Sequence, residues 1–277
     1  MTFDIIEPKV YLVGYTKPNF QAIKEFMSTT FNKTFIVENG DPKYKSEAIR
    51  DITYIGQNSE LIPTLAGKLC YNSFAKKDVD MKEYLQTQII ERCHGSVLEH
   101  VSFNFLITNV SRKFTHEHVR HRIASVSQRS QRYVDESKCS FVAPEAIRKN
   151  IEAYNIWKAA VEQSRLDYSR LINALEKDFN NIDSNIDKTT LRKIVRSSAR
   201  SVLPSSTETM LMWTINARSL RNYLELRCSE FAEEEIRKVA NKIFILAKNV
   251  FPAGFDDYEM SCIDKDSFVI ATKNRRI

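Results

Sequence analysis

The 277-residue chain predicts an α+β fold, in which a mostly antiparallel sheet packs with long helices. Apolar and polar residues alternate cleanly just before residue 110, as expected for a half-buried strand. From about residue 147 the apolar residues recur at helical spacing instead. Strands gathered early and helices gathered late in one chain are typical of the α+β class.

Composition favours one soluble, cytoplasmic domain spanning residues 1–277. Hydrophobic residues make up 43% of the chain, which suffices for a substantial core. No repeat or low-complexity linker divides the chain; residues 30–58 are expected to form a polar excursion and residues 260–277 a peripheral tail. No apolar run approaches the ~18 residues that a membrane span needs, and no basic leader precedes the first apolar stretch, so no membrane partner is expected.

The N-terminal elements follow from local signals. Residues 9–16 read as an early strand, whereas residues 35–58 are polar and rich in turn-forming residues. Ser59 is positioned to cap a helix through residues 60–74, and residues 81–93 predict another helix.

The alternating segment, residues 100–108, predicts a strand with Val101, Phe103, Phe105 and Ile107 on its buried face. Ser111 is a suitable N-cap for a helix that follows through residue 122. We expect this helix to lead into a Ser-rich loop, and that loop to enter a strand at residues 132–138.

The C-terminal half predicts helices. A long amphipathic helix is indicated by Tyr154, Trp157, Val161, Tyr168, Leu171 and Leu175. Asp187 caps a second helix, which ends before Pro204. A third begins at residues 219–227, and residues 233–251 are expected to continue it. Its inward residues would be Ile236, Val239, Ala240, Ile243 and Val250.

Charge and glycine content narrow the choice of ligands. The net charge of +6 mildly favours anionic partners. The six glycines are too scattered to form a dinucleotide-binding turn or a P-loop, so side chains must hold the phosphates of any nucleotide. The five cysteines are odd in number and lack C-x-x-C spacing, which argues against a zinc site and a disulfide framework.

The segment "RHRIASVSQRSQRY", residues 120–133, concentrates four arginines, one histidine and three serines. A solvated basic face would explain it, and so would a cradle for phosphates, which arginine binds in a bidentate manner. All five histidines lie between residues 94 and 121. His116 and His118 are two residues apart and do not share a helix face, so we expect no metal site.

Two further basic groups lie downstream. Arg192, Arg196 and Arg200 are four residues apart and share one helix face, where a solvated stripe is the simpler interpretation for the first two. Arg227 falls on an apolar helical stripe, where a guanidinium requires a partner or a ligand. An ion pair with Glu225 or Glu230 would satisfy it equally well.

Four motifs in order resemble the flavin-dependent thymidylate synthases, the ThyX-type enzymes. They are R-H-R-x7-S at Arg120–Ser130, "HGSVLEH" at residues 94–100, "ARSVLP" at 199–204 and "NARSL…LELR" at 216–227. The resemblance covers about residues 94–251. It implies a ThyX-like α+β fold and a homotetramer with its sites at subunit interfaces.

The resemblance also implies an activity: methylation of dUMP to dTMP, with methylenetetrahydrofolate as carbon donor, NADPH as reductant and FAD as cofactor. By motif position, FAD would contact His94, Ser96, Arg120, His121, Arg122, Gln128, Asn216, Ala217, Arg218 and Asn222. The nucleotide dUMP would contact Glu117, His118, Val119, Arg120, Gln128, Arg129, Ser130, Gln131, Arg132, Arg200 and Arg227. Arg227 would be catalytic, stabilising the uracil ring in its polarised state.

This chain departs from the family pattern at a few positions. It has Ser127–Gln128 where many members have Asn–Glu, and Glu117 where many have Gln. We interpret Ser130 as a phosphate ligand rather than a nucleophile, because a serine hydroxyl needs an adjacent base for activation. Two other interpretations remain at this point: a nucleic-acid-binding arm, which we disfavour because the basic stripe is not dense, and a nucleotide-binding regulator without activity.

Overall fold

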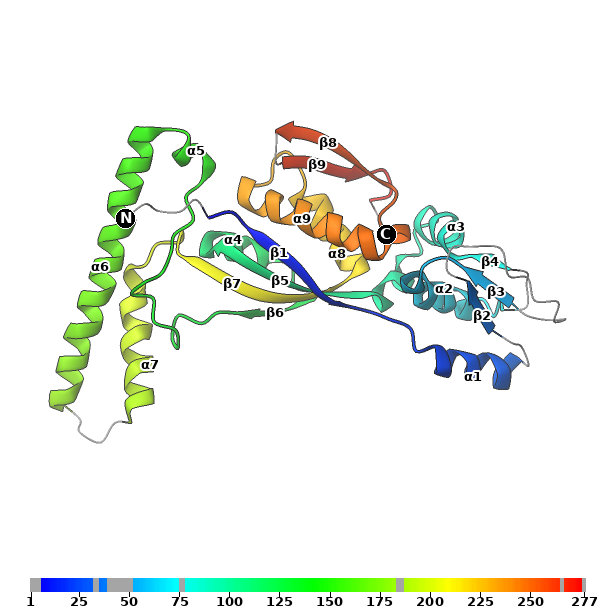
Figure 1. The fold of residues 1–277 in the computed structure, drawn as a ribbon, viewed down its shortest axis with the longest axis horizontal. Coiled ribbons are helices and arrows are strands. Elements are labelled where there is room, and N and C mark those ends of the chain that lie inside the picture. The colour runs from blue at the N-terminus through cyan, green and yellow to red at the C-terminus, as the bar shows by residue number, and fades with distance from the viewer. Residues whose placement is uncertain are drawn as a thin grey trace.

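The computed structural model describes residues 6–31, 35–38, 52–74, 78–182, 187–264 and 267–275. Its centre is a four-stranded sheet in the order β1-β5-β7-β6, with every neighbouring pair antiparallel (Figure 1). The strands are β1 (Lys9–Tyr15), β5 (Ser102–Ser111), β6 (Ala124–Gln128) and β7 (Glu208–Asn216). The α+β prediction with an antiparallel central sheet is therefore confirmed.

One face of this sheet forms the core. The predicted alternation of β5 is confirmed, since Phe103, Phe105 and Ile107 are fully buried. On β7, Trp213 pairs with Phe105 across the strands, with ring centroids 6.1 Å apart. Helices α8 (Ala217–Arg227) and α9 (Glu234–Val250) cover this face, as Figure 1 shows, so the sheet and α8 position one another.

The predicted polar excursion contains strands, which the sequence analysis missed. A second sheet of parallel strands has the order β2-β3-β4. Its strands are β2 (Phe35–Glu38), β3 (Ile52–Ile55) and β4 (Val79–Asp80). Ile, Val and Phe in the first two segments favour β structure, although polar residues surround them. Residues 39–51 lie outside the described residues.

Three of the described helices lie beside the second sheet, and α1 among them was not predicted from the sequence. They are α1 (Phe20–Phe31), α2 (Asn58–Cys70) and α3 (Met81–Tyr84), and α3 continues as a π-helical turn at Leu85–Ile90. Ser59 is not the N-cap of α2, because Gln57 takes that role and its backbone N–H donates to Glu60 Oε2 at 3.0 Å. The predicted helix begins at residue 81 as expected but ends at Ile90, because residues 91–93 form a turn.

Around β6 the sequence prediction was wrong in three places. Helix α4 (Arg112–His118) is capped by Ser111 as predicted, but it ends before residue 122. The expected Ser-rich loop contains β6, and the expected strand at residues 132–138 is turn and coil. The reason is β7, which the sequence analysis did not identify: its free edge supplies backbone partners for residues 124–128.

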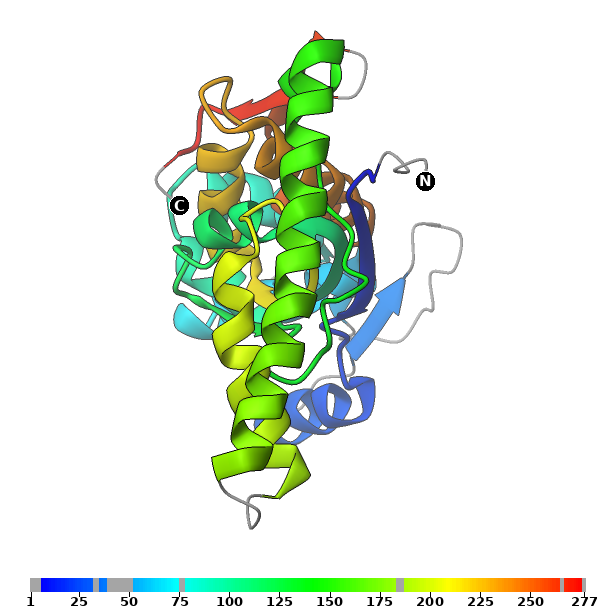
Figure 2. The same cartoon turned by 90° about the vertical axis from the view of Figure 1, so that its left-hand side faces the viewer.

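Helices α5 (Glu145–Arg148), α6 (Ile151–Ile182) and α7 (Lys188–Ala199) form an arm beside the sheet. Figure 2 shows α6 and α7 running side by side, and the two helices are in contact. Asp187 caps α7 as predicted, accepting from the backbone N–H groups of Thr189 and Thr190. A 3-10 turn at Arg200–Val202 ends the arm before Pro204. No described helix is both long and apolar enough to cross a membrane.

The C-terminal segment is integrated into the core. Helices α8 and α9 are separate elements rather than one helix, because residues 228–233 leave the helical path between them. Strands β8 (Tyr258–Asp264) and β9 (Ser267–Thr272) form an antiparallel hairpin. Buried Arg221 of α8 donates two 2.7 Å hydrogen bonds to Asp257, which fixes the hairpin beside α8.

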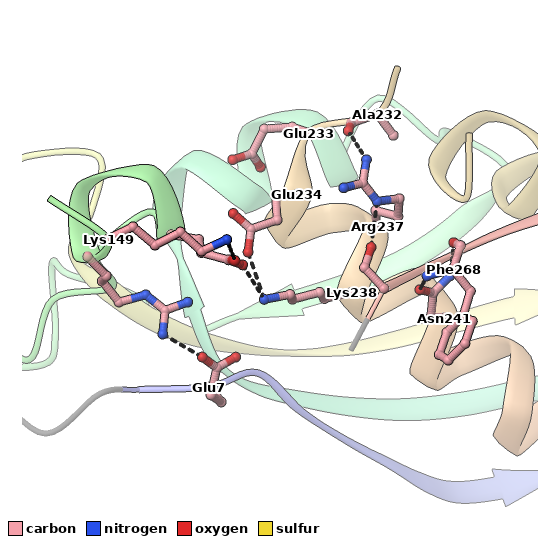
Figure 3. A network of polar contacts seen from close by, with 12 residues as sticks. Glu7, Lys149, Ala232, Glu233, Glu234, Arg237, Lys238, Asn241 and Phe268 are labelled. Carbon is pink, nitrogen blue, oxygen red and sulfur yellow. Dashed lines mark hydrogen bonds and ion pairs between the residues drawn. The ribbon is translucent and has the colours of Figure 1, made fainter. Parts of the chain in front are cut away.

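An ionic network joins the arm to the core (Figure 3). Lys238 of α9 pairs with Glu145 of α5 at 2.8 Å and with Glu234 at 2.7 Å. Beside it, Arg148 pairs with Glu7, which precedes β1, at 2.7 Å. The three elements α5, α9 and β1 are thereby held at one point, and the start of the arm cannot move independently of the sheet.

Candidate active site

A cavity of about 470 Å³ lies between the segment that follows α4 and one face of α8. It brings together six of the residues that the sequence predicted for ligand binding. These are Arg120, His121, Arg122, Arg218, Asn222 and Arg227. The motifs that contribute them are separated by about a hundred residues in the sequence, and the β5-β7-β6 pairing is what makes them neighbours.

Local structure explains how the two walls arise. Helix α4 ends at His118, and a turn at Val119 and Arg120 leads the chain out of the helix and into β6. The other wall begins at Asn216, which caps α8 by accepting from the backbone N–H of Ser219 at 2.8 Å. The side chain of Asn216 therefore serves as the N-cap of α8.

Arg227 has partners on two sides of its guanidinium. Its Nε donates to His121 Nε2 at 2.9 Å, and its Nη1 donates to Glu117 Oε2 at 2.7 Å. Its Nη2 also approaches the backbone oxygen of Glu117 at 3.4 Å. The acids nearest in sequence, Glu225 and Glu230, are not its partners. An ion pair does exist, but its acid comes from α4, and further N–H bonds of the guanidinium remain available.

Two neutral histidines lie behind this arginine. His118 is fully buried, and its Nδ1 lies 3.3 Å from the hydroxyl of buried Tyr223. Burial, with smaller contributions from His121 and Arg227, lowers the pKa of His118 to about 3. Burial and the charge of Arg227 lower the pKa of His121 to about 4. His121 is therefore a neutral acceptor for Arg227 at physiological pH, and it adds no charge to a phosphate site.

Permanent positive charge faces the cavity from other residues. Arg120 and Arg122 are exposed, and neither has an ion-pair partner among the described residues. Arg218 differs, because it pairs with Glu99 at 2.6 Å. Two guanidinium groups without acids beside a cavity fit an anionic ligand such as a diphosphate.

A second group of predicted residues lies at the other end of β6. Arg129 donates to Glu208 Oε2 at 2.7 Å, and Ser130 Oγ accepts from the backbone N–H of Arg132 at 3.3 Å. Gln131 is buried, and its Nε2 has no hydrogen-bond partner. The five residues of β6, a strand roughly 16 Å long, lie between Arg122 and this group. One chain therefore presents two clusters rather than one.

Arg112 is a candidate that the sequence analysis missed. Burial lowers its pKa, and the positive charge of Arg200 lowers it further. Arg112, Arg129 and Arg200 thus form a group of guanidinium groups that repel one another, balanced in part by Glu136. Such a group is stabilised by a bound anion. The only sequence signal was an arginine at the first position of α4, with nothing to indicate Arg200 as its neighbour.

The remaining predicted residues contribute less directly to the two clusters. The Nε2 of Gln128 donates to Thr115 Oγ1 at 3.2 Å. Ala217 is buried at the start of α8, and Val119 is exposed. His94 and Ser96 belong to the 3-10 turn Gly95–His100 and its N-cap, and Glu99 of this turn lines the cavity. The ring of His94 stacks on that of Tyr71, with centroids 6.3 Å apart, and Ser96 is exposed.

Cysteine and metal chemistry have little support around this site. The described residues contain no group of three His, Cys, Asp or Glu side chains that could hold a metal ion. Cys228 follows Arg227 directly, but burial raises the pKa of its thiol to about 12. The thiolate of Cys228 is consequently negligible at neutral pH.

The chain is similar to known proteins over most of its length. A family model described as thymidylate synthase complementing protein matches residues 52–253. A flavin-dependent thymidylate synthase of Mycobacterium avium is 40% identical over 210 residues, which cover 75% of this chain and 82% of the relative. One from Mycobacterium sp. strain JLS is 41% identical over 199 residues, covering 70% and 78%.

Among solved structures, the chain resembles a UMP/dUMP methylase, PolB, from Streptomyces cacaoi, determined with 5-Br dUMP. The TM-score is 0.61 at 19% sequence identity, and the match covers 90% of this chain and 93% of the other. At this identity the similarity concerns the fold alone.

The buried histidines predict a pH dependence of stability. The unfolded chain binds protons at imidazoles near pH 6.5, whereas folded His118 and His121 remain neutral until about pH 3 and 4. The free energy of unfolding is therefore fully developed above pH 6.5 and decreases as the pH falls toward 4. Urea denaturation between pH 7 and 5 measures how the free energy of unfolding depends on pH. This dependence should be flatter for His118→Gln and His121→Asn, whereas His116→Gln, at an exposed position, should keep the wild-type dependence. An identical dependence in all variants would refute this origin.

Proposed function

The chain belongs to the thymidylate synthase complementing proteins, the family of the flavin-dependent thymidylate synthases, and on this basis we propose that it methylates dUMP to dTMP with FAD as cofactor. The proposal includes methylenetetrahydrofolate as the carbon donor and NADPH as the reductant. The observation that carries it is the cavity in which Arg120, Arg122 and Arg227 converge.

The residues that line this cavity fit FAD. Arg120 and Arg122 lack acidic partners and are suited to the diphosphate, a role that a glycine-rich turn plays in other nucleotide-binding folds. Arg218, Ser219 and Asn222 of α8 add donors and an amide along the same wall. When bound, FAD would supply the reducing equivalents for forming the methyl group.

Arg227 is proposed to bind the uracil ring. A guanidinium beside N3 and O4 stabilises the anionic, polarised pyrimidine, and this raises electron density at C5. The N–H bonds that Glu117 and His121 leave free are suited to this contact. No covalent bond from a cysteine or from Ser130 is needed in this scheme.

We further propose that Glu117 positions Arg227 rather than binding dUMP. A carboxylate 2.7 Å from the guanidinium, together with neutral His121 on the Nε side, fixes the plane of that group before substrate arrives. An acid placed against the phosphate of dUMP would repel it, whereas an acid behind Arg227 restricts its rotation. This gives the departure from Gln at position 117 a physical role.

The phosphate of dUMP is assigned to the second cluster. Arg129, Ser130, Arg132 and Arg200 are the motif residues, and Arg112 adds a further, half-buried cation beside Arg200. Bound phosphate would relieve the repulsion among these guanidinium groups.

The separation of the two clusters favours sites shared between subunits of a homotetramer. In one chain, the cavity at Arg227 lies at the start of β6, whereas the motif residues of the phosphate cluster follow its end. The outer face of the central sheet also exposes apolar side chains that a second copy would cover, namely Tyr11, Val13, Met210 and Met212.

The first prediction concerns the flavin. Purified wild-type protein should show an oxidised flavin absorption band and form dTMP from dUMP. Arg122→Ala should lose most of the flavin, because one of the two unpartnered guanidinium groups at the cavity is removed, and it should keep its circular dichroism spectrum. Arg170→Ala, on the exposed face of α6, is the matched control. Full flavin occupancy in Arg122→Ala would show that Arg122 does not bind the flavin.

The second prediction concerns Arg227 and Glu117. Arg227→Ala should reduce turnover by about 10² to 10³, the typical value of one such electrostatic contact. Glu117→Ala should lower kcat without raising the KM for dUMP, and Glu117→Gln should recover part of the loss, because an amide oxygen still accepts from Arg227. Glu152→Gln, exposed on α6, is the control. A raised KM with unchanged kcat in Glu117→Ala would make Glu117 a substrate ligand instead.

The third prediction concerns shared sites. Arg200→Ala and Arg227→Ala, each inactive alone, should recover up to about one quarter of wild-type activity when co-expressed, since a quarter of the mixed interfaces combine both intact residues. Arg122→Ala with Arg227→Ala should not recover, because these residues line one cavity of one chain. No recovery in the first pair, or a monomer in light scattering, would contradict shared sites.

A further inference from the structure

A larger cavity, about 690 Å³, lies elsewhere in the molecule and shares no lining residue with the cavity at Arg227. Four segments enclose it: the end of β1, the turn from β3 into α2, the start of α3 and the end of α9. Part of its wall, from Tyr15 to Phe20, precedes the region that the family model matches. The volume is in the range of sites for small organic ligands.

The position of this cavity in the fold is one where ligands commonly bind. Strands β3 and β4 are parallel, and the residues that follow each of them line the cavity. Ligands of parallel sheets bind beyond the carboxyl ends of the strands. In addition, α2 begins there, and the backbone N–H groups of Asn58 and Ser59 precede its first intrahelical hydrogen bond.

A second, independent observation points to a ligand at the same place. Ser59 lines the cavity and is only 7% exposed, and its Oγ has no hydrogen-bond partner within the part of the chain that the structure describes. A buried hydroxyl without a partner is unfavourable unless something binds it. Gly56, with a φ of 141°, draws the turn so close that a Cβ there would meet Glu60 Oε2 at 2.6 Å. The turn is thus folded tightly around this helix start.

The charged groups of the lining have distinct tasks. Lys17 is exposed, and among the described residues its Nζ contacts the ring of Tyr15, at 5.3 Å, so it is available to an anion. Lys82 is engaged by Asp256 at 2.5 Å. Both oxygens of Glu60 accept backbone N–H groups, from Gln57 at 3.0 Å and Ala253 at 3.3 Å. Asp80 caps α3 through one oxygen and retains the other as an acceptor.

We propose that this cavity binds a mononucleotide, separately from the dUMP and FAD sites. Its phosphate lies at the start of α2, against the N–H groups, Ser59 Oγ and Lys17. Its planar base lies against the rings of Tyr15 and Phe20, and Asp80 accepts a ribose hydroxyl or an exocyclic amino group. The combination of anion donors, aromatic wall and free carboxylate oxygen matches all three parts of such a molecule.

The test is calorimetric titration of AMP into the full-length protein, with FAD and dUMP in excess so that their own sites are filled. AMP should bind, and inorganic phosphate should compete with it. Lys17→Glu should weaken AMP binding at least about tenfold, the effect of losing one charge-assisted contact. Lys9→Glu, at an exposed lysine at the far end of β1, should leave the affinity unchanged. Ser59→Ala should also weaken binding, while adenosine should bind at least about tenfold more weakly than AMP.

The outcomes distinguish this site from the proposed activity. Absence of binding at about 1 mM AMP, equal affinity for adenosine and AMP, or unchanged affinity in Lys17→Glu would each overturn the mononucleotide site. Arg122→Ala should retain AMP binding, since it lines the other cavity. If AMP binding were lost in Arg122→Ala and kept in Lys17→Glu, the titration would report the flavin site and the inference would be wrong.

Discussion

The contact of Arg227 with Glu117 and His121 is the interaction on which the candidate site depends. It joins the C-terminal end of α8 to the end of α4 and the segment before β6, which the sequence places about a hundred residues apart. A half-buried guanidinium requires both an acid and an acceptor, and here both are provided. The same partners restrict the orientations that the remaining N–H bonds can take, so fold stability and ligand geometry rest on one group of atoms.

That contact is possible only because β7 lies in the middle of the sheet. It pairs with β5 on one side and β6 on the other, and it leads directly into α8. The sequence analysis identified β5 from its strict alternation, but it missed β7 and therefore read residues 124–128 as a loop. Small serines give β6 no apolar signal of its own, since its stability comes from hydrogen bonds to an edge that only the tertiary fold provides.

The site was more predictable than the sheet, for a physical reason. The family motifs indicated six residues that line one cavity. Their arginines agree with the expectation that a chain without a glycine-rich turn must hold phosphates with side chains. The sequence could not predict which side chains contact one another across the fold. Glu117 as the partner of Arg227, the neutrality of His121 and the burial of Arg112 beside Arg200 all arise from contacts across the fold, because burial and neighbouring charge set a side chain's role.

The absence of a glycine turn also bears on assembly. A turn of backbone N–H groups holds a phosphate within a single loop, whereas side-chain cations can be contributed from any surface that brings them together. In this chain the cations form two clusters at opposite ends of a short strand, and neither cluster alone surrounds a nucleotide. Binding by side chains is therefore compatible with a site divided between subunits. In the proposed assembly, one interface would complete both the nucleotide and the flavin environment.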